Sequence, residues 1–441
     1  MARAKKEAAL TPEERLQAAL VPDWEWPYKL PENWCWTTVG AINQYVGISA
    51  DPTKAKNKTF ELYSVPSSAD NYPEIVLGAD IGSTKQSVKK GDVLLCKINP
   101  RINRVWKVSK YTDHSLLASS EWIVIRNSGL ISNYLMWCFR SPYFRGYMLS
   151  NVSGVGGSLM RAQPKFVQGY PVPVPPLAEQ QRIVDRIESL FAKLDEAKEK
   201  AQAVVDSFET RKAAILHKAF TGELTAKWRE EHGVGMESWH LRTIGEVCEN
   251  VKVGIVIKPS QYYVPQSEGT PAFRSANVRE CRIDDFDWVY LNEKGMKDNS
   301  RSIVHTGDVL VVRSGNPGTA CVVPERFDGY NAIDILIAVP NKKIIISDYL
   351  CYYTNSPLGK KTVEIGKRGI ALTHFNVKGF SQMPINIPTI PEQVVIVRTL
   401  SDLFAQEQQA KEAAEAVLDQ IDLMKKSILA RAFRGELGTN D

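Results

Sequence analysis

Two loops rich in cationic and amide side chains are the parts of this sequence best suited to binding chemistry. Residues 97–107, KINPRINRVWK, follow a short apolar run, and RSGNPGTA lies in the matching place later in the chain. Arginine and asparagine form paired hydrogen bonds with guanine and adenine in the major groove, and lysine neutralises phosphate. The side chains predicted to contact nucleic acid in these loops are Lys97, Asn99, Arg101, Asn103, Arg104, Lys107, Arg313, Ser314 and Asn316.

A second pair of loops combines glycines with basic and hydroxyl side chains. Residues 153–165 read SGVGGSLMRAQPK, and residues 366–374 read GKRGIALTH. Glycine-flanked basic loops suit phosphate contact through backbone N–H groups. The alternative for both pairs is a polar turn whose charges are simply solvated. The predicted contacts here are Ser158, Arg161, Gln163, Lys165, Lys367, Arg368, Thr373 and His374.

Sequence signatures of catalysis are missing from the chain. Residues 359–362, GKKT, lack the glycine that a P-loop places five residues before its second glycine, and neither GxSxG nor HExxH occurs. The six histidines show no metal-ligand spacing. The seven cysteines are too widely separated for a CxxC site or a disulfide framework. We therefore expect no catalytic residue and no metal site.

A long internal repeat indicates how these loops are positioned. Residues 171–224 align without a gap on residues 384–437, with 24 of 54 positions identical, and the two copies end in AFTGEL and AFRGEL. The copies lie 213 residues apart, which is too long for a solenoid repeat. Weaker matches precede each copy, such as GDVL at 91–94 and 307–310. The sequence therefore predicts a duplicated domain, each copy followed by a long helix.

Each repeated segment carries an apolar seam at heptad spacing through about five heptads. Such a seam favours helix-on-helix packing over packing on a sheet, although two helices covering their own domains are the alternative. We expect an antiparallel pair. Its register places Arg211 against Glu407 and Leu194 against Met424 across the seam. The alternative for the two charged residues is that they extend outward near unrelated neighbours.

Outside the seam, short β-branched and apolar runs predict two α+β domains. The expected strands include 93–96, 122–125, 172–174, 309–312, 321–323 and 333–339. Asn133–Leu149 is expected to form one helix, and residues 11–20 a short helix near the C-terminal end of the second long helix.

Composition is that of an ordinary soluble protein. Hydrophobic and charged residues make up 44% and 24% of the 441 residues, and the formal net charge is +5. That charge permits a nucleic-acid partner without requiring one. No apolar run approaches the roughly 20 residues that span a bilayer. We expect a cytoplasmic protein without membrane contact.

These motifs together resemble the specificity (S) subunit of type I restriction–modification enzymes over essentially the whole chain. The resemblance rests on KKGDVLLCKINP at 89–100, PVPVPPLAEQQRIVDRIESLFAKLDEA at 171–197 and HKAFTGELTAKWR at 217–229, with their second copies. The second copy departs at 389–391, TIP for PLA, and at 394–395, VV for QR.

The resemblance implies a pseudo-two-fold α+β protein with two similar target recognition domains separated by an antiparallel coiled coil. It would be a non-catalytic DNA-recognition subunit that reads a split double-stranded site and docks two methyltransferase (M) subunits, with motor-nuclease (R) subunits completing the restriction complex. S-adenosylmethionine, ATP and Mg²⁺ would bind those partners, not this chain. The rivals are a stand-alone DNA-modifying enzyme and a coiled-coil scaffold for proteins only. The expected divisions are 1–33, 34–175, 176–230, 231–388 and 389–441.

Overall fold

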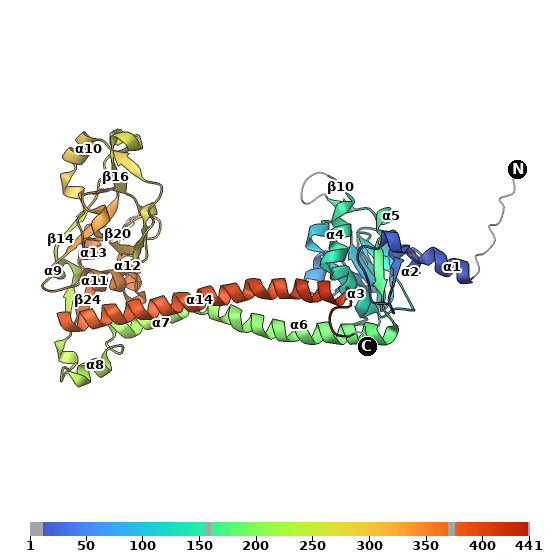
Figure 1. Ribbon diagram of the computed structural model, residues 1–441. Coiled ribbons are helices and arrows are strands. Elements are labelled where there is room, and N and C mark those ends of the chain that lie inside the picture. Colours follow the sequence, from blue (N-terminus) through green and yellow to red (C-terminus); the bar gives the residue numbers. More distant parts are fainter. Residues whose placement is uncertain (1–11, 155–159, 369–374, 440–441) are drawn as a thin grey trace. The chain divides into compact units, whose positions relative to one another are not determined.

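The structure is a computed structural model that describes residues 12–154, 160–368 and 375–439. The chain forms two compact units (Figure 1). The first comprises Met1–Ala201 and Ala416–Asp441, and the second comprises Gln202–Glu415. Each unit therefore contains one globular domain together with one end of the paired long helices.

A short buried sheet forms the centre of the first unit. Its strands β6 (Val93–Cys96), β7 (Val105–Lys107) and β9 (Trp122–Ile125) pair antiparallel in the order β7-β6-β9. Alternate residues of β6 enter different apolar clusters: Val93 and Leu95 pack with the helices, and Leu94 and Cys96 pack on the other face. The run is apolar at every position because both faces of the sheet are covered.

The remaining strands of the first unit form a larger mixed sheet and two ribbons. The mixed sheet has the order β2-β5-β8-β3-β4, with β3 and β8 parallel. The strands are β1 (Cys35–Thr38), β2 (Ser49–Ala50), β3 (Thr59–Tyr63), β4 (Glu74–Leu77), β5 (Lys85–Ser87), β8 (Ser115–Ala118), β10 (Val152–Ser153), β11 (Arg161–Ala162) and β12 (Pro171–Val174).

The second unit repeats this arrangement. Its central sheet has the order β14-β23-β20-β21, and Val309 and Val311 of β20 face the helices while Leu310 and Val312 face the opposite cluster. A second sheet has the order β15-β19-β16-β22. The strands are β13 (His240–Thr243), β14 (Cys248–Val253), β15 (Tyr263–Val264), β16 (Thr270–Phe273), β17 (Val278–Arg279), β18 (Arg282–Ile283), β19 (Val289–Leu291), β20 (Val309–Val312), β21 (Ala320–Val322), β22 (Asn331–Ala332), β23 (Ile335–Pro340) and β24 (Pro384–Ile387).

Two expected elements differ from the structure in their bounds. The helix expected over Asn133–Leu149 is two helices, α3 (Ser132–Arg140) and α4 (Pro142–Ser150). Ser141 caps α4 by accepting from the Phe144 amide, and the proline that follows it cannot continue α3. The strand expected over 333–339 instead begins at Ile335, the first residue of β23, because Asp334 adopts a left-handed conformation with φ 52° between β22 and β23.

The smaller helices follow the same plan in both units. In the second unit α11 (Ser347–Asn355) and α12 (Pro357–Arg368) break at a serine and proline, as α3 and α4 do. The others are α1 (Pro12–Ala19), α2 (Val39–Ile42), α5 (Pro164–Val167), α8 (Ala226–Glu231), α9 (Ile244–Val247), α10 (Glu293–Asp298) and α13 (Val377–Ser381). Within the described residues, no helix is both long and apolar enough to cross a membrane.

The long helices are α6 (Leu177–Asp206), α7 (Phe208–Phe220) and α14 (Ile390–Ala432), and the first two are separated only by Ser207. They run antiparallel to α14. In the first unit Lys425 forms an ion pair with Asp195, and in the second Arg211 pairs with Glu407. The helices themselves can be followed in Figure 1. Gly222 and Gly435, with φ 83° and 75°, follow the ends of α7 and α14 as left-handed caps.

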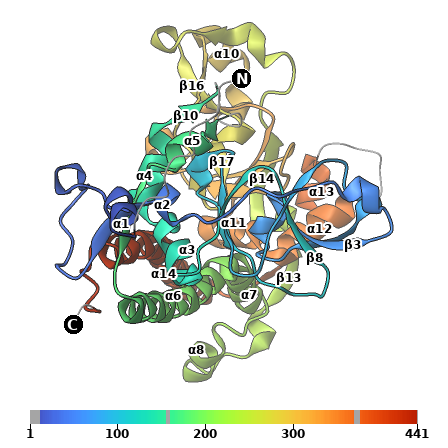
Figure 2. The ribbon, with the colours of Figure 1, turned by 90° about the vertical axis from the view of Figure 1, so that its right-hand side faces the viewer.

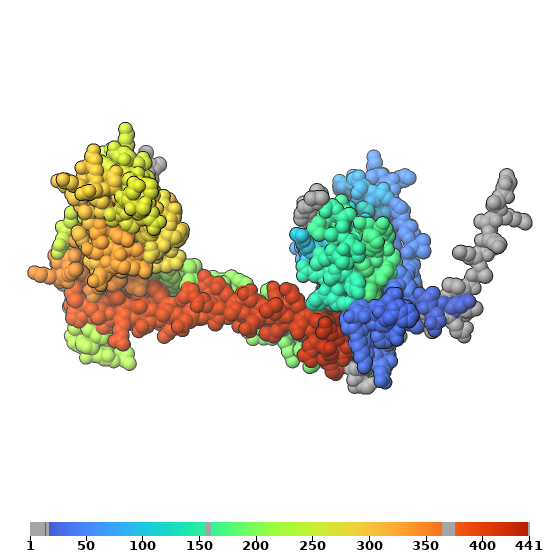
Figure 3. Space-filling view, turned by 45° about the horizontal axis from the view of Figure 1, so that its top comes forward, coloured from blue at the N-terminus to red at the C-terminus, as the bar shows by residue number. Residues whose placement is uncertain are grey.

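The N-terminal part of the first unit packs against the C-terminal end of α14. The Tyr28 hydroxyl donates to the Phe433 carbonyl oxygen at 2.8 Å, and Leu437 packs in the same core as Leu30 and Trp34. In the space-filling view the residues that end α14 lie directly against the N-terminal residues (Figure 3). Described residues near the two ends of the chain, from Val21 to Leu437, therefore share one core, in which α14 and α6 also lie beside α3 (Figure 2).

Candidate nucleic-acid interface

The two basic loops predicted in the first unit lie against each other. Ala162 donates its amide to the Lys97 carbonyl at 2.8 Å, and Asn99 donates to the Met160 carbonyl at 2.8 Å. Ile98 and Arg161 form an antiparallel bridge. The loop that follows β6 and the segment that leads into α5 therefore form one continuous surface, which sequence reasoning treated as two.

The first loop turns sharply at two asparagines. Asn99 and Asn103 both adopt left-handed conformations, with φ 45° and 53°, on either side of one 3-10 turn. Asparagine tolerates this region better than most residues because its short side chain bonds locally. The Asn103 amide donates to the Arg140 carbonyl at 3.1 Å, whereas the buried Asn99 Oδ1 accepts from no described residue.

The cations of this loop differ in how freely they can reach a ligand. Arg101 is exposed at the turn, while Lys97 and Arg104 are half-buried. Lys107 lies away from them, at the end of β7 opposite Val93, where its ammonium group donates to Asn133 Oδ1 at 2.6 Å. Of the cations in this loop, Arg101 has the most accessible side chain.

The second loop adds two exposed cations. Arg161 forms a half-exposed ion pair with Glu121 at 3.2 Å, and Lys165 lies over the Phe166 ring at 4.7 Å. Gln163 is half-buried immediately before α5. The predicted contact Ser158 lies outside the described residues.

The corresponding surface of the second unit is joined by the same hydrogen bond. The Phe375 amide donates to the Arg313 carbonyl at 3.2 Å, as Ala162 donates to Lys97 in the first unit. Of the further predicted contacts, Lys367 and Arg368 end α12 and their side chains are outside the described set, as are all of Thr373 and His374.

The RSGNPGTA loop of the second unit is partly held by a carboxylate from the connection between β22 and β23. Arg313 Nη1 lies 3.1 Å from Asp334 Oδ1, and the Ser314 hydroxyl donates to Asp334 Oδ2 at 3.3 Å. Asp334 is the left-handed residue between β22 and β23, and sequence reasoning did not identify it. Asn316 is exposed and lines a cavity of about 380 Å³ together with Arg279.

A repeated Glu-Gln pair attaches each long helix to its globular domain. Glu179 Oε2 accepts from the Trp34 indole at 3.0 Å, and Glu392 Oε2 accepts from the Trp239 indole at 3.1 Å. Gln180 accepts from the Ile131 amide and donates to the Pro175 carbonyl. Gln393 makes the same two kinds of bond with Ile346 and Pro388. All four side chains are buried, so the motif visible in the sequence has a structural role.

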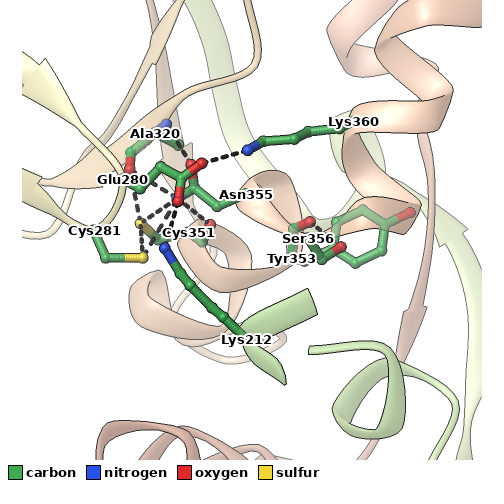
Figure 4. A network of polar contacts seen from close by, with 9 residues as sticks. All are labelled: Lys212, Glu280, Cys281, Ala320, Cys351, Tyr353, Asn355, Ser356 and Lys360. Atoms are coloured by element: carbon green, nitrogen blue, oxygen red, sulfur yellow. Dashed lines mark hydrogen bonds and ion pairs between the residues drawn. The ribbon is translucent and has the colours of Figure 1, made fainter. Parts of the chain in front are cut away.

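The Glu280 carboxylate connects the β17–β18 hairpin of the second unit with α7. Glu280, between β17 and β18, accepts from Lys212 of α7 at 2.5 Å and forms an ion pair with Lys360 of α12 (Figure 4). Burial raises the pKa of Glu280, but the hydrogen bonds from the two lysines outweigh it and leave the pKa below its ordinary value.

Beside this ion-pair network lie two cysteines and an asparagine. The Cys351 thiol donates to Cys281 at 3.6 Å, and Asn355 donates to the Ala320 carbonyl at 2.9 Å (Figure 4). No group of three histidine, cysteine, aspartate or glutamate side chains suited to a metal ion occurs within the described residues.

The ion pair expected across the helical seam is present. Arg211 Nε donates to Glu407 Oε2 at 2.7 Å, and both side chains are partly buried. The same guanidinium donates to the Val204 carbonyl at 3.2 Å, where α6 gives way to α7. Leu194 is half-buried, but Met424 is 44% exposed, so the expected contact between these two stays a prediction.

Comparison with known proteins identifies the family. The model of the type I restriction modification DNA specificity domain matches residues 47–205 and 236–417, which is most of the chain. The chain belongs to this family. The two matches fall on the two copies of the fold, so the family's domain is present twice, and members of the family recognise DNA without being the catalytic component.

The curated relatives are specificity subunits. The EcoKI specificity subunit of Escherichia coli K12 is 26% identical over 71% of this chain and 68% of its own length. The EcoBI specificity subunit of Escherichia coli is 25% identical over 67% of this chain. The chain spans just under two thirds, 64%, of that second relative.

Solved structures share the fold. The HsdS subunit from Thermoanaerobacter tengcongensis superposes with a TM-score of 0.67 at 22% identity, covering 93% of this chain and 99% of that one. A chain from a study of complex assembly and conformational transition in a type I R-M system gives a TM-score of 0.72, also at 22% identity, covering 93% and 100%. At this identity the likeness concerns the fold alone.

Proposed function

We propose that the chain reads a bipartite double-stranded DNA target, with one half read by each globular domain. The recognition domains would be residues 34–175 and 231–388. Residues 176–230 and 389–441 would form the spacer that docks two methyltransferase subunits. Motor-nuclease subunits would complete the restriction complex.

The observation that carries this proposal is that the two domains share the same loop attachments but present different side chains on those loops. The hydrogen bond from Ala162 to Lys97 has its counterpart from Phe375 to Arg313, and each attaches the loop after a buried strand to the segment before a long helix. The side chains on these loops nevertheless differ, with Arg101 exposed at one tip and Arg313 paired with Asp334 at the other. Two copies of one framework that present different donors suit two different base sequences.

The long helices have surface suited to partner subunits. Leu423 of α14 is 63% exposed, and Val394 and Val417 on the same helix are also exposed. These side chains would lie in the contact with the partner subunits, since contiguous exposed apolar surface marks protein interfaces. S-adenosylmethionine, ATP and Mg²⁺ would then be bound by the partners, because methyl transfer and DNA cleavage would be their reactions.

A selection experiment tests the proposal. The chain, assembled with its methyltransferase subunits, is incubated with a random DNA library, and the retained duplexes are sequenced. We expect two short fixed sequences separated by a spacer of constant length. A single uninterrupted motif, or no motif at all, would contradict bipartite reading and favour a scaffold for proteins only.

A second assay addresses the stand-alone enzyme. The purified chain alone is given labelled S-adenosylmethionine and target DNA. We expect no methyl transfer until methyltransferase subunits are added. Transfer by the chain alone would overturn the division of labour.

A further inference from the structure

Two cysteines from distant parts of the second unit lie side by side where the β17–β18 hairpin meets α11. Cys281 belongs to the turn of the hairpin, and Cys351 lies in the middle of α11, 70 residues further along the chain. Their sulfur atoms are 3.6 Å apart, and both thiols are free (Figure 4). The two side chains are therefore within reach of a disulfide, which would bring the sulfurs to about 2.05 Å.

The backbone carbonyl of Ala320 holds both cysteines in this position. The Cys281 amide donates to it at 2.8 Å, and the Cys351 thiol donates to the same oxygen at 3.4 Å. Asn355, one turn after Cys351 on α11, donates to this carbonyl at 2.9 Å and to the Cys281 sulfur at 3.4 Å. One carbonyl and one amide side chain thus fix both thiols, so the sulfurs can approach each other while the hairpin stays on α11.

The two thiols differ in their access to solvent. Cys281 is exposed, whereas Cys351 is 2% exposed, yet both line a cavity of about 430 Å³ that a small oxidant can enter. The hydrogen bond to Cys281 and burial raise the pKa of the Cys351 thiol well above its ordinary value. An accessible thiol beside a second, sheltered thiol is the arrangement of redox-sensing cysteines, in which the accessible one reacts first.

The backbone of Cys281 also favours a role for its side chain. This residue adopts a left-handed conformation with φ 55°. Glycine and asparagine enter that region more readily than cysteine does. A cysteine held there by the hydrogen bonds around Ala320 suits a position where the sulfur itself is used.

We propose that Cys281 and Cys351 are a redox-responsive pair that a peroxide converts to a disulfide. The Cys281 thiol loses its proton and its sulfur attacks the peroxide, so that an S–O bond forms as the O–O bond breaks. With hydrogen peroxide, the departing hydroxide takes that proton and leaves as water, and the sulfur is now a sulfenic acid. The Cys351 sulfur then displaces the hydroxyl group, which leaves with the Cys351 proton as a second water. Two thiols lose two electrons in all, and one peroxide gains them.

The disulfide would tie the hairpin covalently to α11. In the reduced chain the turn of the hairpin is also held by Glu280, which forms ion pairs with Lys212 of α7 and Lys360 of α12. Salt screens such contacts, whereas it does not weaken a covalent bond. Oxidation therefore fixes a hairpin whose Arg279 lines the cavity beside Asn316. This thiol chemistry requires neither DNA nor a partner subunit.

Peptide mapping of the full-length chain tests the pair. Trypsin releases residues 280–282 and 344–360, each of which contains a single cysteine. The reduced chain is treated with hydrogen peroxide, the remaining thiols are blocked with N-ethylmaleimide, and the peptides are analysed by mass spectrometry without reduction. We expect these two peptides to be joined with the loss of two hydrogen atoms, and to separate again after treatment with dithiothreitol.

The other cysteines of the chain provide matched controls. Cys351→Ser should leave Cys281 as a sulfenic acid that dimedone traps, and Cys281→Ser, at an exposed position, should also abolish the cross-link. Cys321→Ala removes the neighbouring buried thiol, whose side chain packs in a different apolar cluster, and should leave the cross-link unchanged. Cys35, an exposed thiol of the first unit, should be oxidised without forming a disulfide within the chain.

Hydrogen exchange measures what the disulfide does to the hairpin. The β17–β18 amides should exchange at least about tenfold more slowly in the oxidised chain than in the reduced chain. The same slowing should persist in Glu280→Gln, because a covalent link needs no ion pair. Peroxide should produce no slowing in Cys281→Ser.

Three results would overturn the proposal. One is Cys281 that proceeds to sulfinic acid while Cys351 stays a free thiol, which would mean that the second thiol does not resolve the first. Another is a cross-link from Cys281 to Cys321, or one between two chains that disappears on dilution. The third is hairpin exchange that oxidation leaves unchanged, because the disulfide would then not tether the hairpin.

Discussion

Replacing Arg229 by methionine should destabilise the second unit far more than an ordinary surface substitution. The side chains of Arg229 and Glu392 are 9% and 0% exposed and lie 2.6 Å apart. Methionine keeps much of the apolar stem but leaves the buried carboxylate without its cation. Removing one partner of a buried ion pair costs about 3–5 kcal/mol.

Comparison with an exposed pair isolates the effect of burial. Lys227 and Glu231 lie 3.8 Å apart on the outer face of α8 and are largely exposed. Lys227→Met should cost at most about 1 kcal/mol, because solvent screens such pairs. The free energy of unfolding is measured by urea denaturation, and hydrogen exchange assigns the transition to the second unit.

A double variant completes the test. Arg229→Met with Glu392→Gln removes both charges, so it should recover part of the stability that Arg229→Met alone removes. If Arg229→Met costs no more than Lys227→Met, the buried carboxylate does not need its arginine. The account of how α8 is held would then be wrong.

Three further predictions concern the second unit. Arg211→Met should lower the stability of the helix pair by about 1–2 kcal/mol in urea denaturation, less at high salt, because the pair with its glutamate is only partly buried; an unchanged midpoint would contradict this. Cys351 should resist iodoacetamide while exposed Cys281 reacts, because a hydrogen bond and burial raise the pKa of the Cys351 thiol well above its ordinary value; equal labelling in mass spectrometry would contradict it. The Glu280 ion pairs should stabilise the β17–β18 hairpin fully above about pH 4.5, and this stabilisation should be lost as the pH falls through the lower folded-state pKa. Hydrogen exchange of the hairpin amides should therefore speed up below that pH in the unaltered chain but not in Glu280→Gln. The same pH dependence in both chains would refute this.

Local sequence predicted the strands of the central sheets well. The runs Val93–Cys96, Trp122–Ile125 and Val309–Val312 are strands with the expected bounds. Each is apolar at every position, and turn residues end it, so few other structures are open to it. The comparisons bear out the family resemblance and the fold class. That resemblance was recognisable because the Glu-Gln helix ending in GEL occurs twice at one spacing.

Features set by tertiary contacts were not predictable in this way. The left-handed turn at Asp334, which separates β22 from β23 and brings a carboxylate to Arg313, depends on the sheets around it. The break between α6 and α7 at Ser207 was not predicted, because the heptad pattern continues through it. In the structure the Val204 carbonyl beside this break accepts a hydrogen bond from Arg211. Glu179 Oε1 has no hydrogen-bond partner in the described part of the chain, whereas Glu392 Oε1 accepts from Arg229, and this difference could be recognised only by comparing the two folded copies.

The composition of the sequence indicated which loops could contact a ligand, but it did not indicate which of their side chains are accessible. Lys107 is cationic and lies within the loop segment, yet strand pairing carries it to the opposite end of the hairpin, where it donates to Asn133. Arg101 remains exposed because it sits on the turn between two left-handed asparagines. The roles of all these residues in DNA reading stay predictions.

Mapping methylated bases across the genome of a host that carries the complete system tests the central claim most directly. The unaltered chain should yield one motif in two parts with a constant spacer. Replacing Arg101 and Arg104 by alanine should relax or change one part, and replacing Arg313 and Asn316 should change only the other. Each side chain that no longer hydrogen-bonds to its base should cost about 1–3 kcal/mol of discrimination. A continuous motif, or variants that alter both parts together, would contradict the reading of one half-site by each domain.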